Sequence, residues 1–258
     1  MRGPPIETWL PPAGAVVLLL LWEGSVRAFG VSAFVLPPPT AVARSLWTGL
    51  SNGVYLQHAL LTATEALGGF VLALAAGVVL GALIAEVRWL EKALYPLLVA
   101  LQAMPKVALA PLVIIWLGYG INSKIVLAGL LGFFPILINA IAGLKSCDAG
   151  KVDVMRALGA GRWQTFRWVK LPNALPFVFA GINVAASFVV LGAVTGEFLG
   201  AKEGLGTLIL LANNELDTAQ IFSILLMLGL LGFVLYSAVR FAQRRLLAWA
   251  PAENLPST

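Results

Sequence analysis

Six polar or charged residues lie inside the long apolar stretches of this sequence. They are Glu65, Lys106, Asn139, Asn183, Ser187 and Glu197. A carboxylate, ammonium or amide in nonpolar surroundings can bind a solute or ion, or it can satisfy a polar group on a neighbouring helix. Both interpretations stay open for Asn139 and Asn183. The spans show no catalytic arrangement of a nucleophile, acid pair or metal cluster, so the sequence does not indicate an intramembrane enzyme.

Lys106 follows Pro105, which removes a helical hydrogen bond and predicts a kink, and Pro111 repeats the disturbance. A cation at such a kink can attract an anionic solute, pair with Glu65 or bind a lipid phosphate. The sequence leaves these three interpretations open.

Cys147 and His58 are the single cysteine and histidine of the chain. Neither has a partner at metal-ligand spacing, and one cysteine cannot form an internal disulfide. We expect both to be structural, with no metal site and no cofactor held by this chain.

A second group of residues, at 153–176, reads DVMRALGAGRWQTFRWVKLPNALP. Asp153 suits the first turn of a short helix, and Gly159 suits its left-handed end. After Gly161, the apolar side chains of Trp163, Phe166 and Val169 recur at helical spacing between basic residues. Pro172 is expected to end this second helix, and Pro176 to lie in the first turn of the next one.

The composition indicates that a bilayer surrounds these groups. Of the 258 residues, 60% are hydrophobic and 11% are charged, and the mean hydropathy is +0.91. Soluble domains carry about 25% charged residues. We therefore predict an all-α, polytopic membrane protein formed by a single domain, 1–258. Its expected spans are 13–29, 59–85, 93–117, 125–144, 174–195 and 221–239, of which the first is weaker because it contains Glu23 and Arg27.

Six spans place both termini on one side of the membrane. No small-residue cleavage site follows 13–29, so this segment is interpreted as a retained span rather than a signal peptide. Most of the 17 Lys and Arg residues, including Arg2 and those of 145–172, then lie on the side of the termini. The opposite side holds Arg27, Arg44, Lys124 and Lys202. This bias predicts that 145–172 and both termini are cytoplasmic, and it explains the basic pI without nucleic acid.

Small residues recur every four positions in the span 59–85, at Gly69, Ala73 and Gly77. This pattern predicts close packing against another helix. No repeat with inverted symmetry is evident, which disfavours the alternative of an ion-coupled secondary carrier working alone.

The segment 153–176 resembles the cytoplasmic signature loop of bacterial ABC importer permeases, E-A-A-x3-G-x9-I-x-L-P. With Gly159 aligned, the glutamate falls on Asp153, the two alanines on Val154 and Met155, and the Leu-Pro on Leu171 and Pro172. The spacing fits throughout, while the first three positions depart from the pattern. LPPPTAV, MPKVALAPLVIIWLGYGINSKI, FFPILINAIAGLKSCD and GEFLGAKEGLGTLI resemble permeases of the nitrate, sulfonate and taurine branch.

This resemblance implies a type I importer fold like that of the methionine importer, in the bacterial inner membrane. It implies a second permease copy, two cytoplasmic ATPase subunits that bind ATP and Mg, and a periplasmic or lipid-anchored solute-binding protein. The loop 145–172 is expected to dock on the ATPase. The coupling residues that the resemblance and the pattern indicate are Asp153, Met155, Ala157, Leu158, Gly159, Ala160, Trp163, Phe166, Leu171 and Pro172.

The same resemblance places Glu197 and the following GAKEGLG at a periplasmic gate, for which a simple hairpin is the alternative. It implies a small solute, an anion such as an aliphatic sulfonate, taurine or nitrate, or alternatively a pyrimidine precursor of thiamine or cyanate. The chain has no G-x-x-x-x-G-K-[ST] motif, so ATP hydrolysis is assigned to the partner and not to this chain.

Overall fold

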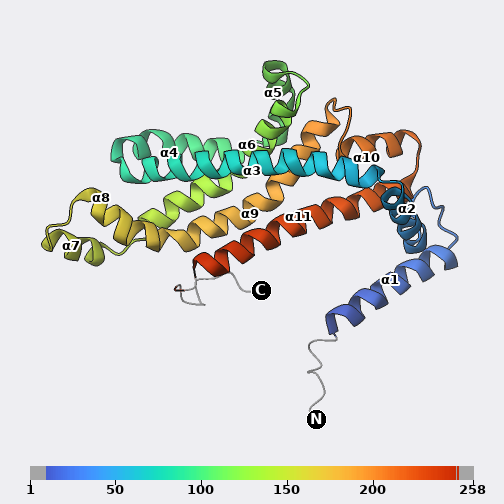
Figure 1. Cartoon of the computed structure of the whole chain (residues 1–258), viewed down its shortest axis with the longest axis horizontal. Helices are drawn as coiled ribbons and strands as arrows, with labels where there is room; N and C mark the ends of the chain where they lie inside the picture. Colours follow the sequence, from blue (N-terminus) through green and yellow to red (C-terminus); the bar gives the residue numbers. More distant parts are fainter. Residues whose placement is uncertain (1–9, 248, 250–258) are drawn as a thin grey trace, which may run out of the picture.

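A computed structural model describes residues 10–247 and 249, and the regular elements of this part of the chain are all helical. The predicted cytoplasmic N-terminus with Arg2, and the C-terminal residues 250–258, lie outside the described residues. The elements shown in Figure 1 are α1 (Leu10–Ala28), α2 (Pro39–Ser51), α3 (Val54–Glu86), α4 (Arg88–Ala103), η2 (Lys106–Leu109), α5 (Ala110–Leu117), α6 (Ile121–Lys145), α7 (Ala149–Ala157), α8 (Arg162–Thr165), η3 (Phe166–Lys170), α9 (Leu171–Phe198), α10 (Leu205–Asn214) and α11 (Thr218–Leu246).

Four helices in the described part are long and apolar enough to cross a membrane: α3, α6, α11 and the continuous helix Arg162–Phe198. The count becomes five if α4 and the segment Lys106–Leu117 form one broken span. The helix α1 overlaps most of the predicted span 13–29 but ends at Ala28 and is not among these candidates.

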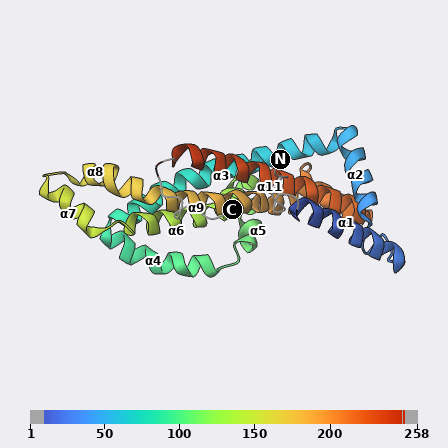
Figure 2. The same ribbon diagram turned by 90° about the horizontal axis from the view of Figure 1, so that it is seen from below.

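The segment predicted as one span at 93–117 is sharply bent. The axes of Arg88–Ala103 and Lys106–Leu117 differ by 94°, with the break at Met104 and Pro105. Since proline lacks the N–H that would continue the helical bonding, the chain turns here and resumes in η2. In both views α5 meets α4 at a corner (Figure 1, Figure 2).

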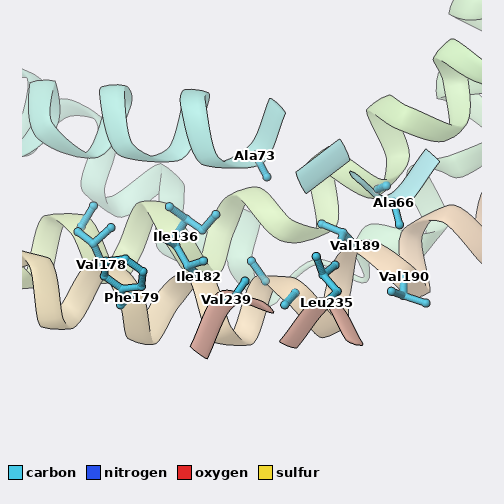
Figure 3. Packing of buried hydrophobic residues seen from close by; sticks show 14 of the residues in the cluster. Ala66, Ala73, Ile136, Val178, Phe179, Ile182, Val189, Val190, Leu235 and Val239 are labelled. Carbon is cyan, nitrogen blue, oxygen red and sulfur yellow. The ribbon is translucent and has the colours of Figure 1, made fainter. Parts of the chain in front are cut away.

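The core of the bundle is formed by α3, α6 and α9, which pack closely along their lengths. Ala73, Ile136 and Val189 belong to this core, and Leu235 and Val239 of α11 cover one side (Figure 3). Glycine makes this spacing possible. A Cβ placed on Gly69 would lie 2.4 Å from Ala128 Cβ, which confirms the close packing predicted for the span 59–85.

The helix α1 lies beside the bundle and contacts α2. The Glu23 carboxylate accepts hydrogen bonds from the backbone N–H of Thr40, at 3.0 Å, and from its hydroxyl. Pro38 occupies the N-cap of α2. The segment 145–172, called the α7–α8 segment below, lies at one end of the bundle and α2 at the other (Figure 1, Figure 2).

Candidate functional site

The segment 145–172 contains the predicted helix, glycine hinge and second helix. Asp148 caps α7 by accepting a hydrogen bond from Gly150 N at 2.6 Å. Gly159 has a φ of +76°, so the predicted left-handed end of this helix is confirmed. Asp153 lies in the second turn of α7 rather than the first, and its carboxylate pairs with Arg156 at 3.0 Å.

The expectation that Pro172 ends the second helix is wrong, because the helix continues from Arg162 to Phe198. The five residues of η3 form a π-helical turn, in which Leu171 N donates to Phe166 O. The wider turn changes the bonding just before Pro172, where the missing N–H and the ring would disturb a regular α-helix. This continuity joins the end segment directly to α9.

Large apolar side chains cover the outside of the α7–α8 segment. Leu158 is 78% exposed, Trp163 is 68% exposed and Trp168 is 69% exposed. The rings of Trp163 and Phe166 stack with centroids 5.6 Å apart. Of the predicted coupling residues, Asp153, Ala157, Leu158, Gly159 and Trp163 are exposed, and Met155, Ala160, Phe166, Leu171 and Pro172 are partly buried.

Two ion pairs position this segment against the helices of the bundle. Lys170 Nζ donates to the Glu86 carboxylate at 2.7 Å, and Lys145 pairs with Glu91. Glu86 ends α3 and Glu91 lies in the first turn of α4. One end of the segment is therefore joined to the start of α4, and the other end to the last residue of α3.

A buried ionic network lies between α3, α6 and α9, toward the α10 end of the bundle. Lys124 Nζ donates to Glu65 Oε1 at 2.8 Å, and both side chains are almost completely buried. Glu197 accepts a hydrogen bond from Thr62 Oγ1 at 2.6 Å and is fully buried. Two of the predicted pathway residues, Glu65 and Glu197, are thus brought together by the fold.

The turn between α9 and α10 wraps around the Glu197 carboxylate. Gly206 N donates to Glu197 Oε2, and Gly204 N donates to His58 Nδ1 at 2.8 Å. A Cβ on Gly204 would lie 2.2 Å from Glu197 Oε1, and its φ of +127° strongly favours glycine. Leu205 N completes the turn by donating to Thr62 Oγ1 at 2.9 Å. The start of α10 is therefore fixed onto α3 and α9.

Several members of this network were missed or misplaced by sequence reasoning. Lys124 was placed in the loop opposite the termini, but it lies buried in the first turn of α6. The option that Lys106 pairs with Glu65 is wrong, since Glu65 pairs with Lys124. His58 has a structural role, as expected. The spacing of His58, Thr62 and Glu65 along one helical face was the available signal.

Lys106 and Asn139 meet in a different place, a cavity of about 420 Å³. Lys106 Nζ lies 4.8 Å from the centroid of the Phe134 ring and donates to Gln102 O at 3.0 Å. Asn139 Nδ2 donates to Pro135 O at 2.8 Å. Two of the six predicted polar residues therefore share one cavity.

Asn183 and Ser187 lie outside both groups. Asn183 Nδ2 donates to Gln243 Oε1 of α11 at 2.8 Å, so it joins α9 to α11. Ser187 is exposed on α9. Among the described residues, no group of His, Cys, Asp and Glu has the arrangement of a metal site.

Comparison with known families identifies the chain. Residues 77–248 match the family described as binding-protein-dependent transport system inner membrane component. The chain belongs to this family. It is accordingly a permease component of an ABC transporter, embedded in the membrane through several apolar helices.

Individual members of the family differ in the solutes that their names state. The chain is 42% identical to the riboflavin transport system permease protein RibX of Chloroflexus aurantiacus, over 92% of this chain and 89% of that protein. It is 34% identical to the formylaminopyrimidine transport permease protein ThiX of Halalkalibacterium halodurans, over 91% and 93%. It is 32% identical to the putative aliphatic sulfonates transport permease protein SsuC of Bacillus subtilis, over 90% and 84%.

The fold also matches a solved transporter. A chain of the MetNI methionine ABC transporter in an inward-facing conformation superposes with a TM-score of 0.66 at 19% identity, over 74% of this chain and 95% of that one. The predicted resemblance to the methionine importer is thereby confirmed for the fold.

Proposed function

We propose that this chain is the membrane subunit of an ATP-driven importer and that the α7–α8 segment is where the ATPase docks. The observation that supports this most is the exposed apolar surface of Leu158, Trp163 and Trp168, on a segment joined to the bundle by the Lys170–Glu86 and Lys145–Glu91 pairs. An apolar patch with a charged rim is typical of a protein interface. Because the second helix runs unbroken into α9, movement of the docked ATPase reaches the core of the bundle.

The proposed assembly contains two copies of this permease, two cytoplasmic ATPases and a solute-binding protein on the outer side. ATP and Mg bind to the ATPases, which carry out hydrolysis. The six spans of this topology are α1, α3, the bent α4–η2–α5 unit, α6, α9 and α11. The basic residues of the α7–α8 segment support a cytoplasmic location for this end of the bundle and for both termini, in the bacterial inner membrane.

At the opposite end, the buried network supports a role for the α9–α10 turn in a gate. The turn is tied to α3 by His58 and Thr62 and closes over Glu197. In this proposal the network fixes α10 in one position, and breaking it releases α10 when the bundle rearranges.

The solute proposed here is a planar heteroaromatic compound of the flavin or pyrimidine type. Similarity to the riboflavin and formylaminopyrimidine permeases supports this class. A small anion such as an aliphatic sulfonate, taurine or nitrate is the second candidate, supported by similarity to SsuC and by the cation Lys106.

The docking surface is tested by copurification with the ATPase. Leu158→Asp with Trp163→Asp removes the apolar patch, and we expect the tagged permease to lose most of its bound ATPase. Leu216→Asp provides a matched control, since Leu216 is also exposed but follows α10 at the other end of the bundle. Normal ATPase recovery with the double variant would rule out docking at this surface.

A further inference from the structure

The cavity that contains Lys106 is separate from the ionic network and has the size of a ligand site. It is bounded by the break between α4 and η2, by α6 and by α9, and its volume of about 420 Å³ lies within the usual range for small-molecule sites. The residues around it are Gln102, Lys106, Val107, Leu131, Phe134, Pro135, Ile138, Asn139, Val184, Phe188 and Leu191.

The wall of this cavity offers flat apolar surface on two helices. Phe134 of α6 is only 8% exposed, so its ring is fixed by packing. Phe188 of α9 is 43% exposed and borders the same space. Most of the remaining lining is aliphatic, which suits a ligand with a broad nonpolar face.

The polar groups of the cavity gather around a cation. Lys106 Nζ lies over the Phe134 ring and uses one N–H for Gln102 O, which leaves two donors on the ammonium. None of the lining residues is Asp or Glu, and within the described chain Lys106 forms no ion pair. The amide of Asn139 is oriented by its bond to Pro135 O. A cation in this setting favours a ligand with electron-rich oxygens.

Size and chemistry together distinguish two kinds of ligand. A compact anion would satisfy Lys106 but leave Phe188 and the aliphatic wall without a partner, whereas Phe134 already contacts Lys106 and Phe133. A planar heteroaromatic compound places its ring against Phe188 and beside Phe134, with its carbonyl oxygens toward Lys106. Its ring nitrogens and carbonyls match the amides of Gln102 and Asn139.

We propose that this cavity is a transit site for a planar heteroaromatic solute, with Lys106 and Phe134 as its main contacts. This inference rests on the proposed function, in which the chain is the permease for such a solute. The break at Pro105 is what exposes the site, because it carries Lys106 away from the axis of α4 and places it over Phe134.

The test uses the complete transporter in nanodiscs, without its solute-binding protein, and riboflavin as the probe. Riboflavin binding is followed by equilibrium dialysis. We expect saturable binding by the wild type and about tenfold weaker binding by Lys106→Met and by Phe134→Leu, the scale of one cation–π or ring contact. Lys106→Arg keeps the charge and should bind within about threefold of the wild type, which separates loss of the contact from misfolding.

Matched controls lie on the same helices. Lys92→Met removes an exposed lysine of α4, and Phe177→Leu removes a ring of α9 that does not line the cavity. Both should bind riboflavin within about twofold of the wild type.

Two results would overturn the inference without affecting the transport assignment. One is unchanged binding in both Lys106→Met and Phe134→Leu; the other is riboflavin uptake by the complete system with no binding to the transporter alone. Failure of the wild type to take up riboflavin even with the binding protein would instead contradict the proposed solute. Taurine displacing riboflavin from the cavity would contradict the preference for a planar ligand.

Discussion

Lys124 lies between carboxylates that are hidden from water. Its Nζ contacts Glu65 Oε1 at 2.8 Å, and its charge also acts on Glu197. Removing one member of a buried ion pair leaves an uncompensated charge, which costs more than the pair contributes. The arrangement therefore depends on all three residues being present.

We predict that Lys124→Met destabilises the permease by about 3–5 kcal/mol, the usual cost of breaking a buried pair from one side. The expected drop in unfolding temperature is measured in detergent by loss of monodisperse protein. Lys145→Met is the matched control, since it breaks a pair with Glu91 that is partly exposed and should cost about 0–1 kcal/mol.

Adding Glu65→Leu to Lys124→Met should restore part of this stability, because no unpaired charge then remains at that pair. A Lys124→Met protein as stable as the Lys145→Met control would contradict the role given to the network.

For individual residues, the sequence indicated which polar side chains lie inside the bundle, but it did not indicate which of them form pairs. Glu65 and Glu197 were singled out by their surroundings alone. Lys124 was assigned to a loop because the predicted span begins at residue 125, whereas α6 begins at Ile121. Pairing depends on the packing of α3, α6 and α9, which the sequence pattern does not specify.

Helices α6 and α9 approach closely because glycines lie where they cross. A Cβ on Gly192 would lie 2.6 Å from Ala128 Cα, a backbone atom that cannot move alone. Around Gly229 of α11 nothing lies within 4 Å of such a Cβ. Gly192 therefore permits a close contact between two helices, whereas Gly229 lies where a side chain could be accommodated.

We predict that Gly192→Ala destabilises the bundle by about 1–3 kcal/mol, as overpacking of a close contact does. Gly229→Ala should be neutral or stabilising by up to about 1 kcal/mol, since alanine favours the helix. Thermal unfolding of the two variants side by side checks this. Equal loss of stability in both variants would show that the close α6–α9 contact does not determine the stability of the bundle.

The turn between α7 and α8 depends on the backbone conformation of Gly159, which can be tested by mutation. Gly159 has a positive φ with open space around it, so Gly159→Ala is penalised by backbone strain and not by a clash. We expect a cost of about 1–2 kcal/mol, confined to this segment. Faster proteolysis between α7 and α8 at unchanged global unfolding temperature is the expected result. Protection equal to that of the wild type would contradict it.

Proline positions were predictable, but their effects were only partly so. Pro105 was expected to kink a span, and the break it forms is a turn of 94°. Pro172 was expected to end a helix, yet the helix continues through a π-turn. Such a turn depends on the packing of neighbouring residues, so local sequence gave no signal for it.

Over the whole molecule, the apolar helices and the α7–α8 segment identify the family and the fold. The all-helical membrane architecture followed from composition and from the length of the apolar stretches, and the family from motifs such as the one at 153–176. The solute did not, since it depends on a cavity formed by three separate helices and by a break whose angle is not encoded locally. Riboflavin was not among the solutes that the resemblance implied.

The proposed assembly has a defined number of subunits, which can be measured. Native mass spectrometry of the purified transporter should show two copies of this chain with two ATPase subunits, as a shared pathway between like subunits requires. A complex that contains one copy of this chain with a different membrane subunit would contradict the homodimer and leave the family unchanged.

The central claim is that solute movement through this chain is driven by an ATPase docked on the α7–α8 segment. The most direct measurement is riboflavin uptake into proteoliposomes with the solute-binding protein on the outside, comparing the permease alone, the permease with its ATPase, and the Leu158→Asp, Trp163→Asp variant with the same ATPase. We predict ATP-dependent uptake in the second case and little in the other two. Uptake by the permease alone, or undiminished uptake by the variant, would contradict the account.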